Sequence, residues 1–163
     1  MTPELYVKNY YPEAKKVEQE TGFHFLILLT LGALESNWGR KAPGHNFFGI
    51  KDTDGINGNE QLVTTTEYLT SAKARFPVII SIIKSGNKFK YKVKDWFRKY
   101  PSAEAGFEDY VNFILTNPRY KIAVEFKQNP ERFFEEIAKA GYATAPGYAQ
   151  SLKNVMKSVI KRL

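Results

Sequence analysis

The sequence contains no cysteine and only two histidines, His24 and His45. Without cysteine the chain has no disulfide, no thiol nucleophile and no thiolate ligand for a metal. Two separated histidines do not form the clustered ligand pattern that is typical of a zinc site, so we expect no metal and no cofactor. No apolar run is long enough for a membrane-spanning helix, and we expect no membrane span.

Acidic residues are scarce in one segment of an otherwise balanced chain. The 163 residues carry a net charge of +7, and between Lys73 and Lys99 nine Lys and Arg residues face a single acid, Asp95. This segment therefore holds the whole basic excess and should be attracted to a polyanion. Over the whole sequence, 43% of the residues are hydrophobic and 25% are charged, which is the composition of a soluble globular domain.

Hydrophobic periodicity predicts helices at both ends of the chain and strands in the middle. We expect a helix over residues 2–21 that Pro12 splits or kinks, and a buried apolar helix over 25–38. A loop over 39–59 precedes a small antiparallel β-lobe at about 61–100, whose lysine-bearing side should be exposed. Further helices follow from Ser102. The expected fold is α+β, mostly α, in a single domain, 1–163.

Glu35 is the unusual residue of the predicted apolar helix. It lies near the helix end among Leu31, Leu34 and Trp38, where an unpaired carboxylate is costly. Burial among apolar groups favours the protonated form of a carboxyl group. A retained proton is what a general acid for glycoside cleavage needs. A structural glutamate bonded to a backbone group or a lysine is the alternative interpretation.

Two sequence blocks favour the catalytic interpretation. Residues 33–39 read Ala-Leu-Glu-Ser-Asn-Trp-Gly, and residues 46–51 read Asn-Phe-Phe-Gly-Ile-Lys. They resemble the blocks Ala-Leu-Glu-Ser-Gly-Trp-Gly and Asn-Leu-Phe-Gly-Ile-Lys of the N-acetylglucosaminidases of glycoside hydrolase family 73. The resemblance covers about residues 10–160. It implies a lysozyme-like fold with the β-lobe beside a cleft, and it places the general acid at Glu35.

Two more blocks agree with this resemblance. Thr-Thr-Glu-Tyr at 65–68 matches the family's block on the β-lobe, so the resemblance makes Glu67 the candidate second carboxylate. Residues 142–149, Tyr-Ala-Thr-Ala-Pro-Gly-Tyr-Ala, match a block whose active-site tyrosine falls on Tyr142. Ala145 replaces the family's aspartate there. We expect substrate contacts from five further residues: Trp38, Asn46, Phe48, Tyr68 and Tyr148.

The resemblance implies an endo-β-N-acetylglucosaminidase that cuts the β-1,4 bond between N-acetylglucosamine and N-acetylmuramic acid in peptidoglycan. Glu35 would protonate the leaving oxygen, and the positive charge at C1 would be balanced by Glu67 or by the substrate's 2-acetamido oxygen. Tyr142 would orient that acetamido group or a water molecule. The expected partners are glycan strands and, through the Lys73–Lys99 segment, anionic wall polymers.

Three alternatives remain open from the sequence. A lytic transglycosylase on the same fold would leave an anhydro-muramic end instead of a reducing N-acetylglucosamine end. A non-catalytic wall-binding or assembly module needs no acid, and a nucleic-acid binder leaves Glu35 unexplained, so we expect no nucleic acid. Action at the bacterial wall, in the periplasm or outside the cell, without a visible signal peptide predicts a phage-encoded, virion-associated or excised domain.

Overall fold

The computed structural model describes residues 1–163, which form two compact units. The helical unit comprises Met1–Gly49 and Tyr100–Leu163, and the sheet unit comprises Ile50–Lys99. None of the helices is both long enough and apolar enough to cross a membrane.

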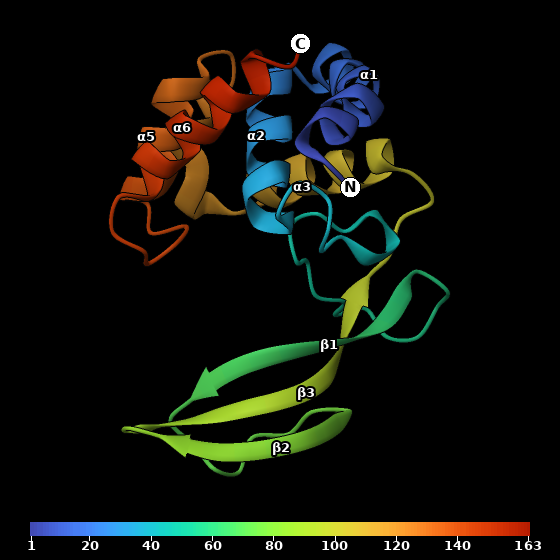
Figure 1. Ribbon diagram of the computed structural model, residues 1–163, viewed down its shortest axis with the longest axis vertical. Coiled ribbons are helices and arrows are strands. Elements are labelled where there is room, and N and C mark those ends of the chain that lie inside the picture. Colours follow the sequence, from blue (N-terminus) through green and yellow to red (C-terminus); the bar gives the residue numbers. More distant parts are fainter. The chain divides into compact units, whose positions relative to one another are not determined.

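The helical unit contains six α-helices and two short 3₁₀ segments (Figure 1). Their bounds are α1 Pro3–Thr21, α2 Phe25–Ser36, η1 Pro43–His45, α3 Ala103–Thr116, η2 Pro118–Tyr120, α4 Lys121–Val124, α5 Pro130–Lys139 and α6 Tyr148–Ile160. The expected helix over 2–21 is continuous, so Pro12 does not split it, and the alternative expectation of a kink at Pro12 stays a prediction. Pro12 lies on the exposed side of α1, while Tyr6, Val7, Ala14 and Val17 anchor the opposite side in the core.

Helix α2 is the centre of the helical unit, as its apolar sequence predicts. It packs against α1, α5 and α6, and Figure 1 shows it between α1 and α6. Ile27, Leu28, Leu29 and Leu31 are fully buried. Burial of four such side chains contributes on the order of 6–12 kcal/mol of hydrophobic free energy before conformational entropy is subtracted. The residue at the end of α2 is therefore held by the most densely buried element of the chain.

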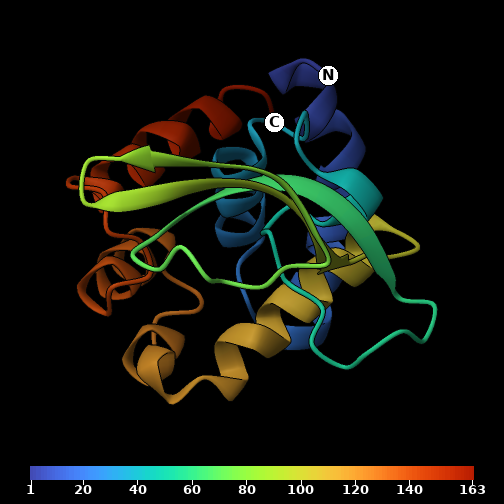
Figure 2. The ribbon, with the colours of Figure 1, turned by 90° about the horizontal axis from the view of Figure 1, so that it is seen from below.

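The sheet unit has three antiparallel strands in the order β1-β3-β2, seen side by side in Figure 2. The strands are β1 Glu60–Leu69, β2 Val78–Ser85 and β3 Lys88–Arg98. Along β3, Tyr91 and Val93 are buried, whereas Lys90, Lys92 and Lys94 are exposed. Because side chains alternate between the two faces of a strand, this pattern confirms the predicted basic, solvated face.

The N-terminus of α2 depends on the protonation state of His24. Its Nδ1 accepts a hydrogen bond from the backbone N–H of Leu26 at 3.1 Å, which caps the helix. Burial, helped by Lys15, lowers the pKa of His24 and outweighs the attraction of Glu18. A proton on Nδ1 would remove the acceptor. The cap therefore stabilises the fold fully above the unfolded pKa of about 6.5 and is lost as the pH falls through the lower folded pKa.

We predict that the free energy of unfolding of the wild type decreases between pH 7 and pH 5 relative to a His24→Asn variant. Asparagine is a good N-cap that does not titrate, and a cap is worth about 1 kcal/mol. Urea unfolding at several pH values measures the difference. Parallel pH profiles for the two proteins would contradict a role for the His24 proton.

Candidate active site

Glu35 lies in the last turn of α2, and the chain turns sharply just after it. Asn37, Trp38 and Gly39 all have left-handed backbone conformations, with φ of 51°, 57° and 78°. The turn is closed by a hydrogen bond from Trp38 N–H to the Ala33 carbonyl at 2.8 Å. The buried Ser36 hydroxyl donates to the Gly32 carbonyl and accepts from Gly39 N–H at 2.8 Å. These bonds fix the helix end that carries Glu35.

The side chain of Glu35 is exposed, so the expected partial burial among apolar neighbours is wrong. In the final turn of α2, Ala33 and Ser36 face the core, while Glu35 faces away from it. The apolar sequence on both sides of Glu35 belongs to the buried face and does not enclose the carboxyl group. Burial is therefore not the feature that distinguishes this glutamate.

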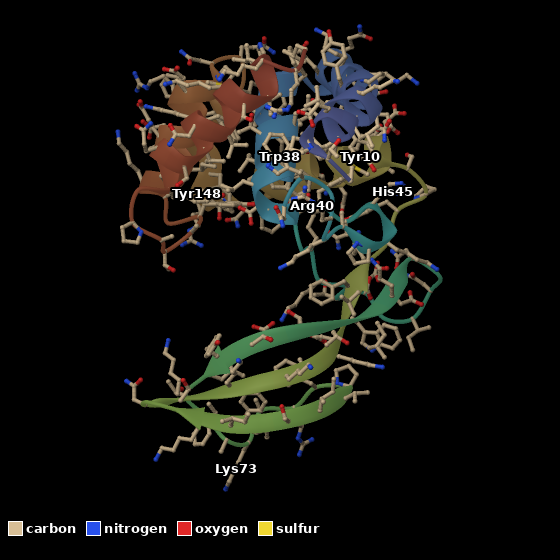
Figure 3. The ribbon with its side chains drawn as sticks, in the orientation of Figure 1. Tyr10, Trp38, Arg40, His45, Lys73 and Tyr148 are labelled. Atoms are coloured by element: carbon tan, nitrogen blue, oxygen red, sulfur yellow. The ribbon has the colours of Figure 1, made fainter.

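A hydrogen bond from Tyr148 distinguishes it instead. The Tyr148 hydroxyl donates to Glu35 Oε1 at 2.6 Å, which joins the end of α2 to the beginning of α6. Tyr148 is 8% exposed, and Gly147 before it adopts a left-handed φ of 71° that starts the helix. Figure 3 shows Tyr148 on α6, on a different element from Trp38, which follows α2.

The Tyr148 hydroxyl stays protonated throughout the physiological pH range. Burial, followed by the hydrogen bond to Glu35, raises the pKa of Tyr148 far above its ordinary value. Tyr148 therefore remains a donor, and Oε1 of Glu35 is engaged as its acceptor. The bond occupies Oε1 and leaves Oε2 of Glu35 without a hydrogen-bond partner in the structure. The geometry therefore holds one oxygen of Glu35 and leaves the other open.

Four tyrosines gather around this hydrogen bond. The ring of Tyr142 stacks on Tyr148 with centroids 5.9 Å apart, and it also contacts Tyr110 and Tyr120 at 6.4 and 5.7 Å. Burial raises the pKa of Tyr142 and of Tyr110, so both hydroxyls are neutral. The Tyr110 hydroxyl is fully buried and has no hydrogen-bond partner of good geometry. The cluster thus places neutral hydroxyls and aromatic surface beside Glu35, and the Arg119 guanidinium lies over the ring of Tyr120, 5.8 Å from its centroid.

Three of the expected substrate-contacting residues have packing roles in the helical unit. The Phe48 ring stacks on Tyr110 with centroids 3.9 Å apart, so it supports the tyrosine cluster from below the surface. Trp38 packs edge-on against Tyr6 and lies under the Arg162 guanidinium. Asn46 is 4% exposed. Their contacts with a substrate stay predictions.

The second predicted carboxylate, Glu67, lies on β1 in the sheet unit. Its Oε1 forms an ion pair with Lys51 Nζ at 2.9 Å, and the same ammonium group lies 3.2 Å from Asp95 Oδ2. Tyr68, the next residue on β1, is 53% exposed on the opposite face of the sheet. Its exposed ring leaves the predicted contact with a substrate open.

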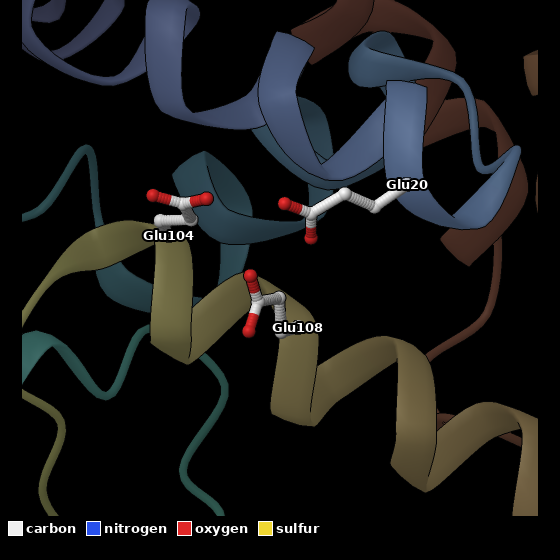
Figure 4. A group of neighbouring side chains, drawn as sticks. All are labelled: Glu20, Glu104 and Glu108. Carbon is white, nitrogen blue, oxygen red and sulfur yellow. The ribbon is translucent and has the colours of Figure 1, made fainter.

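One cluster in the helical unit has the composition of a cation site. The carboxylates of Glu20 on α1 and of Glu104 and Glu108 on α3 point toward one another, with oxygens within 4.8 Å (Figure 4). Partial burial, followed by the neighbouring Glu20, raises the pKa of Glu108. A shared proton relieves the repulsion in such a group, so the cluster does not by itself require a metal ion.

The sequence identified Glu35, Tyr142 and Tyr148 but not the bond between the acid and Tyr148. Tyr142 and Tyr148 belong to the same sequence block at 142–149. Their spacing does not indicate which of the two hydroxyls bonds to Glu35 on α2. Tyr110 lies in α3, a region where the sequence predicts a helix and no site residue. Lys51 is the last residue of the block at 46–51, and the sequence predicts no role for it. The contacts of Tyr110 with the cluster and of Lys51 with Glu67 are tertiary, and a linear motif does not contain them.

The mostly helical fold with a small antiparallel sheet is that of the lysozyme-like glycosidases, and the end of its central helix carries an exposed glutamate bonded to a tyrosine. Residues 11–161 match the Glucosaminidase family, described as mannosyl-glycoprotein endo-beta-N-acetylglucosaminidase. Because the match covers most of the chain, the protein belongs to this family.

Individual relatives agree with this membership. The chain is 32% identical over 161 residues to the peptidoglycan hydrolase FlgJ of Pseudomonas aeruginosa, covering 94% of this chain and 36% of FlgJ. The solved glycoside hydrolase domain of Salmonella typhimurium FlgJ superposes with a TM-score of 0.72 at 26% identity, covering 99% of this chain and 90% of that one. A peptidoglycan hydrolase mutant from Sphingomonas sp. A1 gives a TM-score of 0.69 at 25% identity, covering 98% and 97%.

The chain spans less than half the length of the FlgJ proteins from Pseudomonas aeruginosa and Vibrio parahaemolyticus, 36% and 48% respectively. In contrast, it covers almost the whole of the solved hydrolase domains. The similarity is therefore to the hydrolase part of these longer proteins.

We predict that Tyr148→Phe lowers kcat by about tenfold, with little change in KM, because it removes the bond that orients Glu35 while keeping the ring. A misplaced catalytic group can cost up to about a hundredfold. Tyr120→Phe is the matched control, since it removes a hydroxyl from the same cluster without a bond to Glu35. Steady-state kinetics on a defined glycan measure both variants. Equal kcat values for the two would refute the positioning role of Tyr148.

Proposed function

We propose that this chain is a peptidoglycan hydrolase that acts at the bacterial cell wall. It would cleave the β-1,4 bond between N-acetylglucosamine and N-acetylmuramic acid. The observation that carries the proposal is the Tyr148–Glu35 hydrogen bond on a glucosaminidase-family chain. The names of its relatives, peptidoglycan hydrolases and an autolysin among them, support the choice of substrate.

Glu35 acts as the general acid in this proposal. Its free oxygen protonates the glycosidic oxygen as the bond to C1 breaks, so the leaving sugar departs as a neutral alcohol. Tyr148 holds the other oxygen and prevents the carboxyl group from turning away. Tyr142, stacked on Tyr148, orients the substrate's acetamido group or the attacking water. The hydroxyls of Tyr110, Tyr142 and Tyr148 are neutral, so they add no charge of their own beside the positive charge developing at C1.

Glu67 supports the reaction as a negative charge near the sugar, while the substrate's own 2-acetamido oxygen attacks C1. The ion pair with Lys51 supports a charged form of Glu67. In a direct two-carboxylate route Glu67 would instead activate water. The two routes differ in how much catalysis is lost when Glu67 is removed.

Glu35→Gln should lower the clearing of purified sacculi by about a hundredfold or more, because the amide cannot donate the same proton. Its circular dichroism spectrum should match the wild type, since the side chain is exposed and the amide preserves its shape. Glu20→Gln, the same change at an exposed position on α1, is the control and should clear normally. Near-normal clearing by Glu35→Gln would end the assignment.

Glu67→Gln should lose less activity than Glu35→Gln on the same defined glycan if the acetamido route operates. In the direct route the two losses would be equal. Azide would then restore the turnover of Glu67→Ala by replacing the missing base-activated water, and the azide adduct would have inverted stereochemistry at C1. Turnover with and without azide distinguishes the two routes.

The Lys73–Lys99 segment supplies attraction to anionic wall polymers. Lys90, Lys92 and Lys94 form one exposed row on β3, and Lys73 lies on the connection between β1 and β2 (Figure 3). Such exposed charges attract a polyanion over about 10 Å at moderate salt and are screened as the salt concentration rises. This surface would concentrate the hydrolase on the wall without taking part in bond cleavage.

Replacing Lys90, Lys92 and Lys94 with Glu should weaken sacculus binding at low salt and leave turnover of a short soluble glycan unchanged. A matched triple variant, Lys8, Lys16 and Lys157 to Glu, makes the same change in net charge on exposed positions of the helical unit. Co-sedimentation with sacculi at increasing salt measures binding. Equal weakening by both triples would mean that net charge matters and the strand does not.

A further inference from the structure

One ammonium group in the sheet unit lies between two carboxylates. Lys51 Nζ is 2.9 Å from Glu67 Oε1 and 3.2 Å from Asp95 Oδ2. The acids are mostly enclosed, with Glu67 28% and Asp95 18% exposed, while Lys51 is 44% exposed. Ion pairs with this degree of exposure contribute little to stability. A function for the arrangement is therefore better sought in the orientation of Glu67 than in the fold.

The backbone of Lys51 is attached to β3 by a short ladder of hydrogen bonds. Lys51 pairs with Phe97 in an antiparallel bridge. On either side of it, Asp52 N–H donates to the Trp96 carbonyl at 3.1 Å, and Arg98 N–H donates to the Ile50 carbonyl at 3.0 Å. These contacts fix the start of the lysine side chain against the strand that carries Asp95.

Asp95 fixes the other end of the lysine side chain. Its Oδ1 accepts a hydrogen bond from Trp96 N–H at 2.9 Å, which leaves Oδ2 for the ammonium group. Burial lowers the pKa of Lys51, but the bonds to Glu67 and Asp95 outweigh it and hold the pKa above its ordinary value. Lys51 is thus a permanent cation that is anchored through its backbone and through Asp95.

Of the three side chains, only Glu67 has no anchor other than the ion pair itself. On β1 it faces Tyr91 of β3 in register. The Tyr91 hydroxyl is occupied by the Ser71 carbonyl at 2.5 Å and by Ala74 N–H at 3.2 Å, so it does not bind Glu67. The ammonium group of Lys51 holds Oε1, and no other group in the sheet unit binds Oε2. The direction of Oε2 therefore depends on Lys51.

We propose that Lys51 is a positioning residue that holds Oε1 of Glu67 and directs Oε2 toward the substrate or the attacking water, with Asp95 holding Lys51 in place. This inference rests on the proposed supporting role of Glu67. Lys51 itself does not contact the reacting atoms. This positioning role also gives a reason for the lysine at the end of the block Asn-Phe-Phe-Gly-Ile-Lys at 46–51.

Four variants of the full chain test this role: Lys51→Met, Lys51→Arg, Asp95→Asn and the double variant Lys51→Met with Glu67→Gln. Lys51→Met should lower kcat on a defined glycan about tenfold with little change in KM, because only the orientation of Glu67 is lost. Lys51→Arg should restore most of the activity, since a guanidinium can bind both carboxylates. Asp95→Asn should give a smaller loss than Lys51→Met. Circular dichroism verifies that each variant is folded.

The double variant distinguishes failure of this inference from failure of the role proposed for Glu67. If Lys51 acts through Glu67, adding Lys51→Met to Glu67→Gln causes no further loss of kcat. A loss that multiplies in the double variant would show that Lys51 acts independently, and this would overturn the inference while leaving Glu67 in place. Normal kcat with only a lower melting temperature would make Lys51 structural. Normal turnover by Glu67→Gln alone would instead remove the role of Glu67, and with it the inference.

Discussion

The hydrogen bond between Tyr148 and Glu35 is the interaction on which the proposed chemistry of the helical unit depends. It joins residues 113 positions apart, one at the end of the most apolar helix and one at the beginning of the last helix. Helix α2 is held by its buried leucines and isoleucine, and the aromatic stack on Tyr148 holds the other partner. The position of the proposed proton donor is therefore set by the core of the fold, although the carboxyl group itself is exposed.

The two candidate carboxylates have opposite environments. Glu35 is held by a neutral tyrosine hydroxyl, a partner that can stay bonded whether or not the carboxyl group carries a proton. Glu67 is held by an ammonium group, a partner suited to a charged carboxylate. A glycosidase needs one carboxyl group that releases a proton and, in most families, a second that balances positive charge. The difference between a hydroxyl and an ammonium partner matches these two tasks.

Much of the fold could be predicted from the sequence because its patterns are local. The alternation of lysines with Tyr91 and Val93 predicted an exposed basic face on β3, and the apolar run of α2 predicted a central helix. The expected split at Pro12 was wrong because core contacts on the other side of α1 keep that helix continuous. The burial of Glu35 was wrong because apolar neighbours in sequence need not surround a side chain at a helix end. The partners of Glu35 and Glu67 depend on distant contacts, which no local pattern contains.

The central claim is that Glu35 delivers a proton while water completes the cleavage. Mass spectrometry of muropeptides released from purified sacculi in ¹⁸O-labelled water tests it most directly. The account predicts fragments that end in reducing N-acetylglucosamine carrying one ¹⁸O atom, and no such fragments from the Glu35→Gln variant. Fragments ending in unlabelled anhydro-muramic acid would contradict the account, since they would identify a lytic transglycosylase.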